Sequence, residues 1–162
     1  MERFLPLLNK AKVVMGLAPI TPSTSTPDYV CMKGYQKCTA IIAVDNGNTV
    51  TGSAITLKEA MVVAGTDEQA LAFSKMWANL DTDASDTLVE TAVAANTFTT
   101  LTTNGKNALY VIEIDADDLD LDDGFDCVRV GTANAANTVL SVVYILHGTR
   151  YAPTLDRSAI TD

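Results

Sequence analysis

The segment CTAIIAVDNGN, residues 38–48, carries the two signals that decide the fold. Its first seven residues are apolar, small or β-branched, which is typical of a strand that packs on a pleated sheet. Its last four contain the dipeptide Asn46-Gly47, and this pair readily adopts the positive φ angles of a tight hairpin turn. The same dipeptide recurs as Asn104-Gly105. We therefore expect short strands separated by tight turns.

Nine segments from residue 29 onward have this character. They cover residues 29–33, 38–44, 53–63, 70–78, 87–93, 97–101, 108–114, 126–130 and 138–147. Alternation is clearest in the fourth, where Leu71, Phe73 and Trp77 are expected to share one face. One short helix within residues 57–72 remains an alternative, because good helix formers gather there. Strands at this spacing predict an all-β fold, an antiparallel β-sandwich or a barrel.

The two ends of the chain differ in composition from the middle. Residues 1–28 hold four of the five prolines, and proline is excluded from helix interiors and central strands. We expect an extended N-terminal arm over residues 1–28, with a short amphipathic helix between residues 4 and 17. A β-sandwich domain then spans residues 29–152, and a polar C-terminal tail spans residues 153–162.

The charge of the protein is concentrated in one segment. The formal net charge is −9, and residues 115–126 contain seven aspartates and no basic residue. Such a surface repels phosphate backbones, so direct nucleic-acid binding is not expected. An EF-hand is also excluded, because the sixth position of the loop would be Asp123 and the twelfth Arg129. The segment is read as a solvated loop anchored by Leu119, Leu121 and Phe125, with a looser calcium site or a docking patch for a basic neighbour as alternatives.

Residues suited to catalysis are sparse. The single histidine, His147, follows an apolar strand and is expected to be a structural hydrogen-bonding residue. No phosphate-binding glycine motif occurs. The sequence therefore predicts a protein that is not an enzyme and binds no cofactor.

The three cysteines, Cys31, Cys38 and Cys127, lack C-x-x-C spacing. This pattern argues against a disulfide framework, a zinc ribbon or another metal site, and favours buried thiols in a reducing cytoplasm. No apolar stretch approaches the length of a secretory signal or a membrane span, so no membrane contact is expected.

Four segments of the chain resemble a known group of proteins. They are Gly34-Tyr35, TVTGSAITLK (residues 49–58), FSKMWAN (residues 73–79) and GFDCVRVG (residues 124–131). Together they resemble small virion proteins encoded in the head modules of tailed phages and prophages, over roughly residues 29–152. The resemblance implies a capsid-associated β-sandwich of the jelly-roll type that binds the outside of a shell built by a separate major capsid protein.

The expected function is that of a structural virion protein that decorates or cements the capsid. Its partners would be the major capsid protein and neighbouring copies of itself on the lattice, and it would be made in the host cytoplasm and end at the capsid surface. Four apolar residues of the arm are predicted to bind these partners: Phe4, Leu5, Leu7 and Leu8. A tail or connector component is the main alternative. A carbohydrate-binding sandwich is another, although the aromatic content of 6% is low for a sugar platform.

Overall fold

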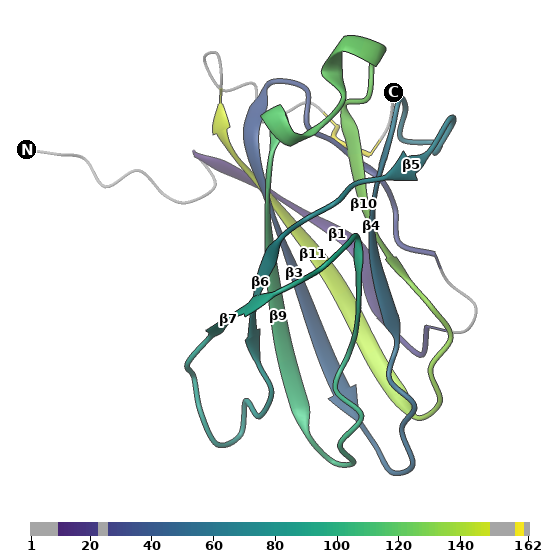
Figure 1. Ribbon diagram of the computed structural model, residues 1–162, viewed down its shortest axis with the longest axis vertical. Coiled ribbons are helices and arrows are strands. Elements are labelled where there is room, and N and C mark those ends of the chain that lie inside the picture. The colour runs from purple at the N-terminus through teal and green to yellow at the C-terminus, as the bar shows by residue number, and fades with distance from the viewer. Residues whose placement is uncertain (1–9, 23–25, 150–157, 161–162) are drawn as a thin grey trace, which may run out of the picture.

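The computed structural model describes residues 10–22, 26–149 and 158–160 (Figure 1). Within these ranges, eleven strands form two antiparallel sheets, which confirms the predicted all-β sandwich. The large sheet has the order β1 (Ala11–Ile20), β11 (Thr138–Thr149), β3 (Tyr35–Asn46), β9 (Asn107–Asp115), β6 (Lys75–Asn79) and β7 (Val89–Ala92). The small sheet has the order β2 (Val30–Cys31), β10 (Cys127–Thr132), β4 (Ala54–Ala60) and β5 (Gln69–Ala70), and β8 (Thr97–Thr99) also pairs with β4.

The strand order is that of a jelly roll. Leaving out β5, β6 and β7, the remaining eight strands form the four-stranded arrays β1-β11-β3-β9 and β2-β10-β4-β8. Successive strands of this frame lie in opposite sheets, except β4 and β8, which both lie in the small sheet, so all its other connections cross from one sheet to the other. The segment between β4 and β8 adds β5 to the edge of β4 and adds β6 and β7 to the large sheet.

The two Asn-Gly turns join different sheets, so the expectation of tight hairpins there is wrong. Asn46 ends β3 in the large sheet, whereas the next strand belongs to the small sheet. Gly105 has a positive φ of 65°, as expected, yet it also lies between strands of opposite sheets. The Gly47 N–H donates to the Asn137 carbonyl at 2.9 Å, and the Gly105 N–H donates to the Gly47 carbonyl at 2.8 Å. These loops therefore bond to each other and close one end of the sandwich.

The main core lies between the sheets. Its largest fully buried side chains are Tyr110, Tyr144, Ile42, Ile55, Leu57, Ile112, Ile114, Leu140, Leu146, Val30, Val128 and Val130. Tyr144 ties the two sheets together, because its hydroxyl accepts the Val130 N–H at 2.9 Å and donates to the Asp28 carbonyl at 3.2 Å. The hydroxyl therefore holds β11 of the large sheet against β10 of the small sheet.

The sandwich begins well before residue 29. The prediction of a helix between residues 4 and 17 is wrong for residues 11–17, because Ala11–Ile20 is strand β1 at the edge of the large sheet. Val14 and Leu17 are buried there. Pro19 is tolerated because an edge strand has one unpaired side and because the register shifts between Leu17 and Ile20. Residues 11–20, which the sequence assigned to a separate arm, therefore belong to the sandwich.

Both terminal segments are attached to the sandwich where the structure describes them. The Asp28 N–H donates to the Gly16 carbonyl at 2.9 Å, and Pro27 is buried. In the C-terminal segment, Ala159 is buried and its carbonyl accepts the Cys31 N–H at 2.7 Å. This part of the expected polar tail therefore packs on β2.

The interpretation of residues 70–78 as one alternating strand is also wrong. The strands β5 and β6 are separated by residues 71–74, and Leu71 donates its N–H to the Leu57 carbonyl at 3.0 Å. This break reverses the alternation, so Met76 is buried and Trp77 lies on the outer side. The alternative helix within residues 57–72 is not formed, because β4 continues to Ala60 and a loop leads to β5.

The acidic segment forms two short 3₁₀ turns, η2 (Ala116–Asp118) and η3 (Leu121–Asp123), at one end of the sandwich (Figure 1). Leu119 and Phe125 are buried and anchor it as predicted. Leu121 does not, because its residue surface is 43% exposed. No helix among the described residues has the length and apolar character needed to cross a membrane.

Candidate interaction face

The large sheet has apolar residues on both of its faces. In β3, β9 and β11, alternate residues point into the core and are buried, and the residues between them point outward. We call the outward apolar residues of this sheet the outer apolar face: Val13, Met15, Ile41, Ala43, Trp77, Leu109, Val111, Val139, Val143 and Ile145.

One row of this face crosses five strands. Met15 of β1 pairs with Val143 of β11, and Val143 pairs with Ile41 of β3. Ile41 pairs with Val111 of β9, which in turn pairs with Trp77 of β6. Side chains at directly opposed positions lie about 4.5–5.5 Å apart at Cβ. The row is therefore a continuous apolar stripe across the sheet.

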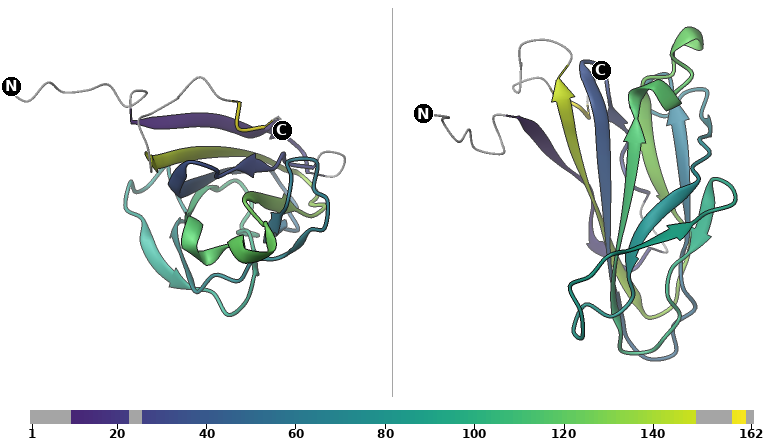
Figure 2. Two further views of the ribbon diagram at one scale, coloured as in Figure 1. Left: turned by 90° about the horizontal axis from the view of Figure 1, so that it is seen from above. Right: turned by 60° about the vertical axis from the view of Figure 1, so that its left-hand side comes forward.

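The outer apolar face is open to solvent at its margins and half-buried at its centre. Met15 is 53% exposed and Val13 is 45% exposed, whereas Ile41 and Val111 are shielded by their neighbours. No further layer of described strands lies over the sheet (Figure 2). Contiguous apolar patches of this kind on a folded domain mark surfaces that bind other molecules.

Charged residues border the face on the β9 and β6 side. Lys37 of β3 and Asp115 of β9 form an ion pair at 2.7 Å, and the carboxylate raises the pKa of Lys37. Lys75 of β6 pairs with Glu90 of β7 at 3.4 Å and lies 5.1 Å from the centre of the Trp77 ring. All four charged side chains are about half exposed, so these pairs contribute little stability. An apolar centre with a charged border is the usual composition of a protein interface.

His147 lies in a shallow depression at one end of the face. The depression is lined by Lys10, Ala11, Thr39, Ile145, His147, Gly148 and Thr149. The Nε2 atom of His147 and the Oγ1 atom of Thr39 are 3.0 Å apart across the β3–β11 pair. The histidine thus makes a cross-strand hydrogen bond.

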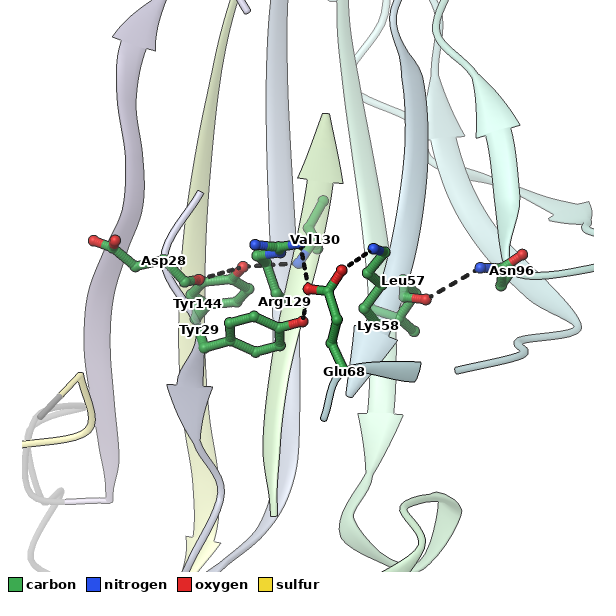
Figure 3. A network of polar contacts seen from close by, with 9 residues as sticks. All are labelled: Asp28, Tyr29, Leu57, Lys58, Glu68, Asn96, Arg129, Val130 and Tyr144. Carbon is green, nitrogen blue, oxygen red and sulfur yellow. Dashed lines mark hydrogen bonds and ion pairs between the residues drawn. The ribbon is translucent and has the colours of Figure 1, made fainter. Parts of the chain in front are cut away.

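The outer side of the small sheet, by contrast, is covered by the protein's own chain. Glu68, just before β5, accepts hydrogen bonds from the Tyr29 hydroxyl at 2.7 Å and from Arg129 Nη2 at 2.9 Å, and it also pairs with Lys58 (Figure 3). The Arg129 guanidinium lies 4.5 Å from the centre of the Tyr29 ring. These contacts hold the loop 61–68 over the sheet.

The electrostatics of this network follow from its geometry. Hydrogen bonds from Lys58 and Tyr29 lower the pKa of Glu68. Burial and the hydrogen bond to Glu68 raise the pKa of Tyr29. Beneath the loop, Tyr29 packs with Ala60, Cys31, Cys127 and Val63 in a small second cluster. The loop 61–68 therefore covers the outer side of the small sheet, whereas the outer side of the large sheet exposes apolar residues to solvent.

The residues predicted from the sequence to bind partners, Phe4, Leu5, Leu7 and Leu8, lie outside the described residues. The outer apolar face was missed. A signal for it exists in the sequence, because residues 39–44 and 139–146 are apolar or weakly polar at almost every position. A strand with one solvated face would alternate with polar residues instead.

Comparisons with known proteins find likenesses of low sequence identity and low structural similarity. No protein-family model matches it, and no curated protein matches it. Among solved structures, the SPBc2 prophage-derived protein YomS is similar with a TM-score of 0.49 and 14% identity, over 85% of this chain and 93% of that one. The CBM22-1–GH10 modules of the Clostridium thermocellum xylanase Xyn10B give a TM-score of 0.32 and 7% identity, over 91% of this chain and 28% of that one. Neither likeness is strong enough to bear on function.

Proposed function

We propose that this protein is a structural virion protein that decorates or cements a capsid shell. It binds the major capsid protein, and neighbouring copies of itself, through the outer apolar face of the large sheet. The observation that carries the proposal is the row from Met15 to Trp77, which spans five strands on a sheet face over which none of the described strands lies. The resemblance of residues 29–152 to small phage head proteins supports a shell as the partner.

The geometry suits attachment to a regular lattice. Each long strand of the sheet is nine to twelve residues in length, so the face is supported by backbone hydrogen bonds and changes little on binding. Contacts between neighbouring copies on the shell then add retention by multivalency, without further chemistry.

The proposal is tested with capsids assembled without this protein and incubated with the purified chain. We expect the wild-type protein to co-sediment with the shells. The Met15→Glu variant places a charge at a 53% exposed position of the outer apolar face and should lose binding.

Met61→Glu is the matched control. It makes the same substitution at a 37% exposed position, beside the closed small sheet, and should bind like the wild type. Equal binding of all three proteins would show that the outer apolar face does not bind the shell. Absence of wild-type binding to heads, with binding to isolated tails, would favour the alternative role as a tail or connector component.

A further inference from the structure

Two cysteines that are far apart in the sequence are adjacent in the fold. Cys31 of β2 lies directly opposite Cys127 of β10. The next pair along, Met32 and Asp126, is joined by a hydrogen bond from the Met32 N–H to the Asp126 carbonyl at 2.8 Å. In an antiparallel ladder the two kinds of pair alternate, so Cys31 and Cys127 form a non-hydrogen-bonded pair, whose Cα atoms are only about 4.5 Å apart.

A carboxylate completes the group. The Oδ1 atom of Asp126 lies 3.2 Å from Cys127 Sγ and 3.8 Å from Cys31 Sγ. All three potential ligand atoms lie within 4.8 Å of one another, and no other group of three such side chains converges in this way among the described residues. The Lys33 N–H donates to Cys31 Sγ at 3.4 Å. Hydrogen bonds of this kind orient the ligands of metal sites.

We propose that Cys31, Asp126 and Cys127 form a binding site for a thiophilic divalent cation, Zn²⁺ above all. With Zn–S bonds of about 2.3 Å and Zn–O bonds of about 2.1 Å, tetrahedral geometry requires ligand atoms roughly 3.6–3.8 Å apart. The sulfur–oxygen distances of 3.2 and 3.8 Å fit this requirement with shifts of a few tenths of an ångström. Two thiolates also favour Zn²⁺ over Mg²⁺ or Ca²⁺.

The surroundings of the site suit a structural metal ion. Cys127 is 1% exposed, and Cys31 and Asp126 are half-buried. Asp126 also lines a cleft of about 260 Å³, bounded by Met32 and Gly124 among others, so its carboxylate borders space that a fourth, water ligand can occupy. Bound metal would fasten β2, only two residues long, to β10.

The full-length protein is tested after treatment with EDTA, in the presence of a phosphine reductant, with the thiols counted to establish that they are free. Titration with Co²⁺, which reports thiolate ligands by absorbance, should give a near-ultraviolet sulfur-to-cobalt charge-transfer band that saturates at one ion per chain. Zn²⁺ should then displace Co²⁺ and raise the melting temperature. Absence of the band in the reduced protein would overturn the proposal.

Variants distinguish this site from any other. Cys31→Ser and Cys127→Ser should each lose the charge-transfer band while keeping the far-ultraviolet circular dichroism of the wild type, and Asp126→Asn should weaken Zn²⁺ binding. Cys38→Ala, at a thiol buried in the main core, and Asp122→Asn, at an exposed carboxylate of the acidic segment, are the controls and should bind like the wild type. A band that persists in Cys31→Ser or disappears in Cys38→Ala would show that the ligands are misassigned.

Discussion

Val111 of β9 lies directly opposite Trp77 of β6, and both side chains belong to the outer apolar face. The pair joins two parts of the fold, because β9 belongs to the eight-stranded jelly-roll frame and β6 to the segment inserted between β4 and β8. The insertion therefore widens the open apolar surface beyond the frame. The small sheet has no such surface, since Glu68 and the loop before it cover its outer side.

Two adjacent residues of β9 test which side chains of the large sheet point outward and which point into the core. Val111 is half-buried on the outer side of the sheet, whereas Ile112 is 0% exposed. A glutamate at position 111 reaches water, so Val111→Glu should change the free energy of unfolding by no more than about 1 kcal/mol. Ile112→Glu buries a carboxylate without a partner and should prevent folding or cost several kcal/mol. Urea unfolding measures both, and similar losses in the two variants would contradict the assignment of the faces.

The hydroxyl of Tyr144 is expected to stabilise the sandwich. Tyr144→Phe leaves the Val130 N–H without its partner in a buried position, which should lower the free energy of unfolding by about 1–3 kcal/mol. Tyr35→Phe is the control, because the Tyr35 hydroxyl has no hydrogen-bond partner among the described residues, and it should cost less. Thermal unfolding of the two variants decides the matter, and equal melting temperatures would show that the bond to Val130 contributes nothing.

The network around Glu68 predicts a pH dependence. Its pKa is lowered in the folded protein from the ordinary value of 4.5, so the stability that it contributes is present above pH 4.5 and is lost as pH falls through the lower folded value. The carboxylate is 34% exposed, so screening by solvent keeps the effect small. The stability difference between wild type and Glu68→Gln should shrink when urea unfolding is measured at decreasing pH below 4.5. If this difference in the free energy of unfolding does not depend on pH, the ionised form of Glu68 does not contribute to stability.

The thiols should differ in reactivity in the metal-free protein. A hydrogen bond from Cys127 lowers the pKa of Cys31 to about 7, whereas burial raises the pKa of Cys38. Because the thiolate is the nucleophile, iodoacetamide should modify Cys31 first, at a rate that rises with pH and levels off above about pH 7 to 8. Mass spectrometry of peptides after timed quenching gives the rates. Faster modification of Cys38 would contradict the burial of that residue.

The sequence predicted the strands of the sandwich well and its connections poorly. All nine expected segments contain strand, because alternation and β-branched residues act locally. The Asn-Gly dipeptides were interpreted as hairpin turns, yet both connect the two sheets. Local turn chemistry does not reveal which strands pair, since a jelly roll pairs strands that are distant in sequence, such as β1 with β11.

The first strand was missed because the four prolines of residues 1–28, one of which is Pro19, argued against a sheet. An edge strand with an irregular register accommodates that residue. The pair Cys31 and Cys127 was missed for a related reason, since spacing rules detect ligands that are close in sequence. Their proximity depends on the β2–β10 register, which no local pattern encodes.

The central claim, that the outer apolar face attaches this protein to a capsid, is tested most directly by electron cryomicroscopy of particles carrying it. The account predicts β-sandwich density at regularly repeated positions on the outside of the shell, with the row from Met15 to Trp77 buried against the major capsid protein or a neighbouring copy. Density at the tail, or sandwiches whose large sheet faces solvent while the loop 61–68 makes the contacts, would contradict it.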